Sequence, residues 1–254
     1  MSFRRLLRRW QGALLSIVGI VATVYLGVSG QLGLYIHPRY FVFTMVMAVI
    51  AAALVVAAFA LLPAAEDEHE HELPEDDGGR WAWLWPAGSI LIIVAATVGL
   101  LVLPPATLTT ATVAKRDLNG STSLITQKEA SDLVGGDYST FTVRDWSSLL
   151  RQGAGEDFFA DKTATVTGFV TPDTSDPENV FFVARFVVSC CAVDAQPVGI
   201  PVYYPGWQDE FPTDSWVAIE SGFNTNPSIR SDETIALVPS EITPTDQPAQ
   251  PYVY

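Results

Sequence analysis

Three long apolar runs without a charged residue most constrain what this chain can fold into. They cover residues 12–30, 40–62 and 84–105. Each approaches the roughly 20 residues that an α-helix needs to cross a bilayer. None has the polar face that a helix on the surface of a soluble domain shows at a spacing of 3.6 residues. The runs therefore predict three transmembrane helices, in a multi-pass protein that is embedded in the lipid bilayer. A cleaved signal peptide is the alternative for the first run.

Basic residues near the ends of these runs predict the side of the membrane on which each end lies. Four arginines fall within residues 4–9, directly before the first run, and such ends stay in the cytoplasm. Three crossings then give a transmembrane region over residues 1–109, with an acidic cytoplasmic loop at 64–80. Everything after this region is expected outside the plasma membrane.

The remainder of the chain is acidic and is expected to form a separate domain. The whole sequence has 14 Lys and Arg against 28 Asp and Glu, which gives a formal net charge of −14. Acidic surfaces repel phosphate backbones, so the composition argues against a nucleic-acid partner.

Residues 110–240 predict an extracytoplasmic all-β domain. A helix is expected first, over residues 142–153, with Asp145 in its first turn and Gly153 at its end. Alternating β-branched and aromatic residues then indicate five strands, at 162–170, 180–191, 198–204, 215–223 and 233–239. Five short strands favour an OB-like five-stranded barrel, with a split sandwich as the alternative. Residues 241–254 are rich in Pro, Thr and Gln, which predicts a flexible tail.

Two adjacent cysteines lie at the end of the second expected strand. Consecutive α-carbons are about 3.8 Å apart, which is too close for a relaxed disulfide. Alternation along the strand places Cys190 on the same face as Phe182, Ala184, Phe186 and Val188, which predicts a small buried side chain.

A carboxylate follows the cysteine pair closely. Cys190, Cys191 and Asp194 together offer donors for zinc or copper(I). A thiol-redox site is the second interpretation. An inert cysteine beside a turn that Asp194 caps is the third. Arg185 is the charged residue on the Cys191 face of the same strand.

Two further segments contain candidate ligands or anchors. In the turn after the first apolar run, His37 could join the cysteines as a ligand, but an interfacial anchor formed with Tyr35, Pro38 and Arg39 is its simpler interpretation. Arg39 is expected to dock the outer domain onto the membrane helices. In the acidic loop, His69 and His71 alternate with carboxylates and form a weak metal-binding candidate. A solvated acidic linker is the simpler interpretation of that loop.

Two motifs carry a family resemblance. The sequence YIHPR lies between the first two apolar runs, and CCAVDA begins at Cys190. Together with VTGFV at residues 166–170, they resemble the YcgQ-like family of bacterial membrane proteins. In that family a YI-x-PR turn follows the first helix and a CC-x-x-D motif lies in the soluble domain. Val193 occupies a position where the family usually has alanine. The resemblance implies a subunit that partners a multi-spanning permease.

The sequence therefore predicts a non-enzymatic accessory subunit of a membrane permease. The motifs of hydrolases, metalloproteases and nucleotide-binding enzymes are missing from the sequence. The expected outer domain presents Cys190, Cys191 and Asp194 for handling a metal ion. An extracytoplasmic thiol-redox protein and a structural membrane protein with inert cysteines are the alternatives.

Overall fold

The structure is a computed structural model that describes residues 3–61, 84–101, 103, 107–120, 138–153 and 155–254. It divides into two compact units. The helical unit contains residues 1–33 and 38–106, and the barrel unit contains residues 34–37 and 107–254. The tetrapeptide 34–37 thus belongs with the barrel, although the chain on both sides of it is helical.

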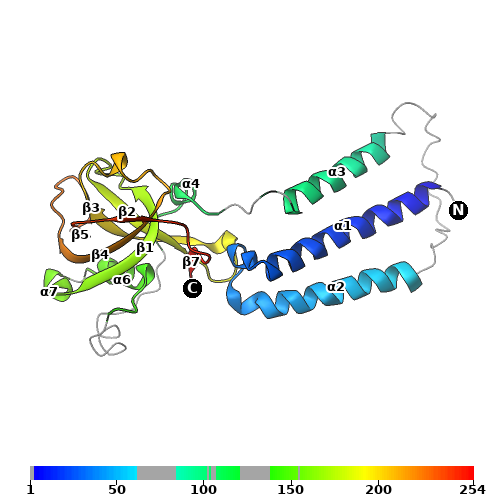
Figure 1. Cartoon of the computed structure of the whole chain (residues 1–254), viewed down its shortest axis with the longest axis horizontal. Helices are drawn as coiled ribbons and strands as arrows, with labels where there is room; N and C mark the ends of the chain where they lie inside the picture. Colours follow the sequence, from blue (N-terminus) through cyan, green and yellow to red (C-terminus); the bar gives the residue numbers. More distant parts are fainter. Residues whose placement is uncertain (1–2, 62–83, 102, 104–106, 121–137, 154) are drawn as a thin grey trace. The chain divides into compact units, whose positions relative to one another are not determined.

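The helical unit contains the helices α1 (Phe3–Val28), α2 (Phe41–Leu61) and α3 (Leu84–Leu101), and α1 packs against both others (Figure 1). A Cβ atom at Gly27 would overlap the flexible end of Met45 in α2, so a larger residue there would require that side chain to move. The short 3₁₀ helices η1 (Gln31–Leu34) and η2 (Pro38–Tyr40) lie between α1 and α2.

One helix among the described residues is long and apolar enough to cross a membrane. It spans Pro38–Ala58 with a mean hydropathy of 2.7, and only 6% of it is buried. The segments Gly12–Val28 and Ala87–Leu100 are apolar but shorter. Three spanning helices were expected, and one described helix has the required length and composition. The acidic loop predicted at 64–80 lies outside the described residues.

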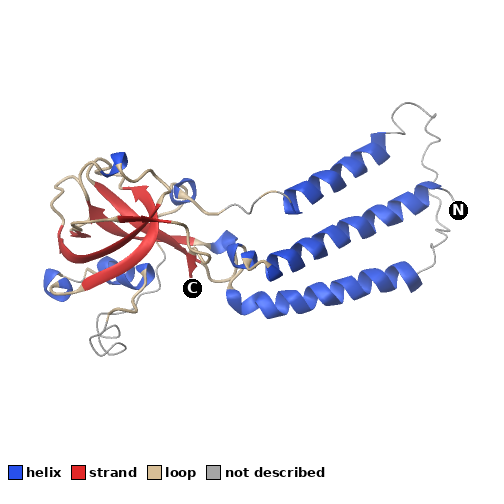
Figure 2. Ribbon diagram, viewed as in Figure 1, coloured by secondary structure: helices blue, strands red, loops and turns tan. Residues whose placement is uncertain are grey.

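The described residues of the barrel unit form seven strands, five of which close into a mixed barrel (Figure 2). The strands are β1 (Thr163–Pro172), β2 (Val180–Val187), β3 (Gln196–Tyr203), β4 (Trp216–Thr225), β5 (Ile235–Leu237), β6 (Thr243–Thr245) and β7 (Tyr252–Val253). Closure follows the order β1-β2-β3-β5-β4, and β4 pairs again with β1. All five expected strands are present, and β3 and β5 pair in parallel where the barrel closes.

Short helices accompany the strands of the barrel unit. They are α4 (Thr110–Val113), α6 (Val143–Arg151) and α7 (Glu156–Phe159). Thr142 and Asp145 form a capping box at the start of α6, and Gly153, with φ of +70°, follows its end. The expected helix over residues 142–153 is therefore confirmed, together with both of its end signals.

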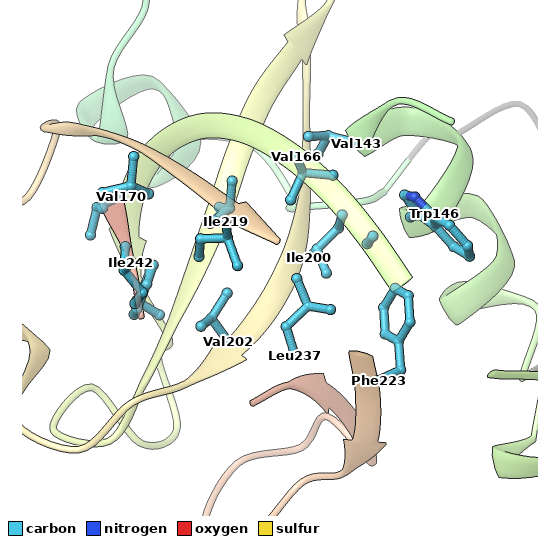
Figure 3. Packing of buried hydrophobic residues seen from close by; sticks show 14 of the residues in the cluster. Val143, Trp146, Val166, Val170, Ile200, Val202, Ile219, Phe223, Leu237 and Ile242 are labelled. Atoms are coloured by element: carbon cyan, nitrogen blue, oxygen red, sulfur yellow. The ribbon is translucent and has the colours of Figure 1, made fainter. Parts of the chain in front are cut away.

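A continuous hydrophobic core fills the barrel. Figure 3 shows Val166, Val170, Ile200, Val202 and Ile219 converging between the strands, all of them at most 3% exposed. Trp146 packs onto this core from α6 and is completely buried. The core includes Phe181 and Val183 of β2.

The other face of β2 packs in a second cluster, which corrects the predicted orientation of that strand. Phe186, Val188 and Tyr252 belong to this cluster. The sequence pattern assigned the Phe186 face to the barrel core, but both faces of β2 are buried, because side chains that include Phe169 and Tyr252 pack against the Phe186 face. Apolar alternation cannot distinguish the two faces of a strand that is buried on both.

The C-terminal segment forms strands, whereas a flexible tail was expected. β6 pairs with β4, and β7 pairs in parallel with β2. Tyr252 is only 4% exposed and stacks edge-on against Phe186, with ring centroids 6.5 Å apart. The segment is rich in Pro and Thr, yet its last residues are ordered by pairing with a distant strand.

Gly168 of β1 is expected to be essential for barrel closure. A Cβ atom there would lie 2.5 Å from the carbonyl oxygen of Ala184 and 2.8 Å from Val183 Cγ1. Because a backbone atom cannot yield as a side chain can, Gly168→Ala should destabilise the fold by about 1–3 kcal/mol. Thermal unfolding of the full chain in detergent measures this effect. Gly222→Ala is the matched control, since its Cβ would have its nearest neighbour at 3.8 Å. Equal melting temperatures for the two variants would contradict the prediction.

Candidate metal-binding site

The two cysteines lie in a short loop between β2 and β3. This segment, residues 188–195, is called the cysteine loop below; it follows the last register pair of the hairpin, Val187 with Gln196. Both cysteines are free, and Cys190 is exposed while Cys191 is partly buried. Cys190 Sγ lies 3.5 Å from Cys191 Sγ. The pair is thus a vicinal dithiol without a disulfide bond.

Asp194 fixes the shape of the cysteine loop. Its Oδ1 accepts the N–H of Ser189 at 3.1 Å, and its Oδ2 accepts the N–H of Cys190 at 2.7 Å. These two donors are thereby diverted from the β2–β3 ladder, and β2 ends at Val187. The predicted burial of Cys190 is therefore wrong, because the strand ends before the cysteine. The turn-capping role considered for Asp194 is confirmed by these two hydrogen bonds.

The tetrapeptide 34–37 pairs with the cysteine loop inside the barrel unit. Ile36 and Cys191 form an antiparallel bridge. The N–H of His37 donates to the Cys190 carbonyl at 3.0 Å, and the N–H of Ala192 donates to the Tyr35 carbonyl at 2.8 Å. Backbone hydrogen bonds therefore hold the peptide that joins the two cysteines and the peptide that follows it.

Arg116 is a further residue at the cysteine loop, which the sequence did not indicate. Its Nη2 donates to the carbonyl oxygen of Val193 at 3.0 Å, across 77 residues of chain. Val193 itself is 83% exposed at the tip of the loop. Basic residues and acidic turns are both common in protein sequences, so their presence could not predict the contact between Arg116 and Val193.

The donor atoms of three residues converge in the cysteine loop. One ligand atom each from Cys190, Cys191 and Asp194 lie within 4.8 Å of one another. Among the described residues, this is the group of cysteine, histidine and acidic side chains with the spacing of a metal site. Thiolates and a carboxylate suit a soft or borderline metal ion.

The charge on Asp194 controls the protonation of Cys190. The hydrogen bond of the Cys190 thiol with the Asp194 carboxylate, aided by Cys191, raises the pKa of Cys190 to about 12. Burial of Asp194 works to raise its own pKa, but hydrogen bonds from the Cys190 thiol and from backbone N–H groups outweigh burial and lower that pKa. At neutral pH the pair is thus a thiol beside a carboxylate.

We expect Cys190 to react slowly with alkylating agents although it is exposed. Its raised pKa lowers the thiolate fraction, and the thiolate is the nucleophile. Higher intrinsic nucleophilicity offsets part of this loss, so at pH 7.5 alkylation should be roughly tenfold or more slower than in the denatured chain. Mass spectrometry after timed iodoacetamide treatment gives both rates. Asp194→Asn should speed the reaction by removing the negative charge, and a fast wild-type Cys190 would refute the assignment.

The other expected site residues occupy different positions. The His37 ring lies edge-on against the Tyr254 ring, with centroids 4.6 Å apart, and His37 is not part of the converging donor group. Arg185 donates to the carbonyls of Thr167 at 2.7 Å and Gln250 at 3.0 Å, a structural role.

Arg39 and its neighbours belong to the connection between the helices. Arg39 stacks over the Tyr40 ring at 5.1 Å, and Pro38 begins η2. Their predicted anchoring at a membrane interface stays a prediction. His69 and His71 lie outside the described residues.

Comparison with known families assigns both halves of the chain. Residues 13–119 match the DUF1980 N-terminal domain, and residues 144–254 match the DUF1980 C-terminal domain. The chain carries both DUF1980 domains. This agrees with the resemblance to the YcgQ-like family, and the cysteine loop falls in the DUF1980 C-terminal domain. No curated protein and no solved structure matched the chain.

Proposed function

We propose that this DUF1980 protein is a membrane-bound accessory subunit whose barrel unit binds a metal ion in the cysteine loop. The observation that carries the proposal is the convergence of Cys190, Cys191 and Asp194, whose ligand atoms lie within 4.8 Å of one another. Accessible donors of two kinds in one ordered loop suit binding better than they suit a structural core.

The membrane part of the proposal keeps three spanning helices, a cytoplasmic N-terminus and an extracytoplasmic barrel of OB-like type. Support comes from the exposed apolar side chains of α2 and α3, such as Val42 at 76% and Leu91 at 69%. Lipid is the environment in which such surfaces are stable. The strand order β1-β2-β3-β5-β4 with closure onto β1 suits the OB-like assignment.

Sidedness is open to a direct labelling test. Ile229 is completely exposed, so Ile229→Cys in a chain with both native cysteines changed to serine gives a single reactive reporter in the barrel unit. A membrane-impermeant maleimide should label this variant in intact cells. Labelling that requires lysis would place the barrel in the cytoplasm and refute this orientation.

The experiment that tests metal binding compares three purified full-length proteins. Wild type should bind one thiophilic metal ion per chain, and Cys191→Ser should lose it. Val193→Ala is the matched control, because Val193 lies in the same loop, is 83% exposed and has an apolar side chain. Elemental analysis gives the stoichiometry, and an unchanged ratio in Cys191→Ser would remove the proposed site.

A thiol-redox function is the second candidate, favoured by the 3.5 Å separation of the two sulfurs. The raised pKa of Cys190 argues against it, because redox-active cysteines have lowered pKa values. Free-thiol titration with and without a chelator separates the two candidates. Thiols that a chelator unmasks indicate bound metal, and thiols that react rapidly without a chelator indicate redox chemistry.

The permease partnership is the part of the proposal that rests on the family resemblance. The test is affinity purification from native membranes with a tag on this chain only, in which a multi-spanning membrane protein should co-purify. Recovery of this chain alone from gently solubilised membranes would argue for an independent metal-binding protein.

A further inference from the structure

We infer that the cysteine loop is shaped for a divalent ion of the zinc class in tetrahedral coordination, with an open fourth position for exchange. The two thiolates and one oxygen of Asp194 would supply the other three donors. This inference rests on the proposed function, because it concerns which ion the same donors take.

The separation of the two sulfurs is the first observation. Cys190 Sγ and Cys191 Sγ are 3.5 Å apart. Two thiolates about 2.3 Å from a tetrahedral zinc ion lie roughly 3.8 Å apart, since a tetrahedron's edge is about 1.6 times its centre-to-corner distance. A linear sulfur–metal–sulfur unit with bonds of that length needs roughly 4.6 Å. The dithiol thus already has nearly the spacing of tetrahedral coordination, whereas linear copper(I) would require it to open by about 1 Å.

The backbone around the dithiol resists such an opening. The Cys190 N–H is held by Asp194 at 2.7 Å, and the Cys190 carbonyl is held by the N–H of His37 at 3.0 Å. On the other side, the Ala192 N–H bonds to Tyr35 at 2.8 Å. Both cysteines are therefore fixed at the main chain, and adjustment is left to their side-chain torsions.

The chemistry of the third donor points to the same ion class. Zinc accepts carboxylate oxygen beside thiolate sulfur, whereas copper(I) selects sulfur. The sulfur of Cys190 and a carboxylate oxygen of Asp194 lie within 4.8 Å of each other. A cation that takes the place of the thiol proton would lie between these two groups and bind both.

The fourth position distinguishes an exchange site from a structural site. Structural zinc ions have four protein ligands, whereas sites that react or exchange leave one position open. Within the part of the chain that the structure describes, the donor group consists of three residues. Cys190 is exposed, so water or a donor from another molecule can reach the ion.

Thiol protection in the full-length protein tests the inference. The protein, in detergent and without oxygen, receives Zn²⁺, Cu⁺ or no metal, and the alkylation rate of the two cysteines is measured by mass spectrometry. We expect Zn²⁺ to protect both cysteines, whether or not Cu⁺ also protects them. Protection by Cu⁺ alone would overturn the zinc assignment and leave the proposed metal function standing. Failure of both ions to protect would overturn both proposals.

Cobalt(II) reports the coordination geometry directly. Titration of the same protein should give the intense visible absorption of tetrahedral cobalt with a thiolate charge-transfer band, saturating at one ion per chain. Zn²⁺ should displace it, Cys191→Ser should abolish the band, and Val193→Ala should retain it. A weak octahedral spectrum without charge transfer would refute the geometry. Two chains per cobalt ion would refute the three-donor site within one chain.

Discussion

Asp194→Ala should cost the protein its metal site, with a loss of affinity of at least about a hundredfold. Residues that only orient a ligand typically contribute ten- to a hundredfold to affinity, and Asp194 is expected both to orient and to bind. Its carboxylate holds the N–H groups of Ser189 and Cys190, so alanine also releases the backbone that positions the thiols. Competition with a chromophoric chelator measures the loss in affinity.

Asp194→Asn separates the two roles of this residue. An asparagine oxygen can still accept a backbone N–H, but the negative charge and one acceptor are gone. If the carboxylate binds the metal, the asparagine variant should lose most of the affinity that the alanine variant loses. If Asp194 only caps the turn, asparagine should bind metal nearly as well as wild type. Wild-type affinity in the alanine variant would eliminate Asp194 from the site altogether.

Metal affinity should rise steeply with pH, because the thiols must lose protons to bind. Cys190, with its pKa raised to about 12, is protonated throughout the range from pH 6 to 8. Each thiol proton that the metal displaces makes the apparent association constant increase by about tenfold per pH unit. Because the thiol pKa of Cys190 is raised, acid favours the protonated thiol and therefore the metal-free protein.

The measurement is a series of chelator competitions at constant ionic strength between pH 6 and 8. A slope of at least about tenfold per unit is expected from Cys190 alone. Proton release measured in weakly buffered solution provides an independent count of displaced protons. An association constant that does not change with pH would contradict the proposed site, because its thiol donors must lose protons to bind a metal.

Local sequence signals were sufficient to predict most of the barrel unit. Alternating apolar residues located all five barrel strands, and Asp145 and Gly153 marked the two ends of α6. These features depend on neighbours within a few residues, which is the range over which periodicity and capping act.

The features that sequence reasoning missed depend on contacts between distant residues. β7 is ordered because Tyr252 pairs with Phe186, 66 residues earlier in the chain. The end of β2 was misplaced because Asp194 accepts the N–H groups that would have continued the strand. Asp194, seven residues after Val187, is a signal that could have placed this end, since its carboxylate competes for backbone donors.

The candidate site was identified in part from sequence. Cys190, Cys191 and Asp194 were expected together, and the structure brings their donor atoms together. Two contacts of the loop were not predictable, because each joins residues far apart in the chain. Arg116 lies 77 residues from Val193, and Ile36 lies 155 residues from Cys191.

The assignment of residues 34–37 to the barrel unit determines how this protein can be dissected. A fragment that starts at Thr107 would lack the tetrapeptide that pairs with the cysteine loop, leaving the carbonyl of Cys190 and the N–H of Ala192 without their partners. A faithful water-soluble version would need residues 34–37 grafted ahead of Thr107 through a flexible linker. By the same reasoning, mutations in residues 34–37 should alter the thiol reactivity and metal binding of the two cysteines rather than membrane insertion.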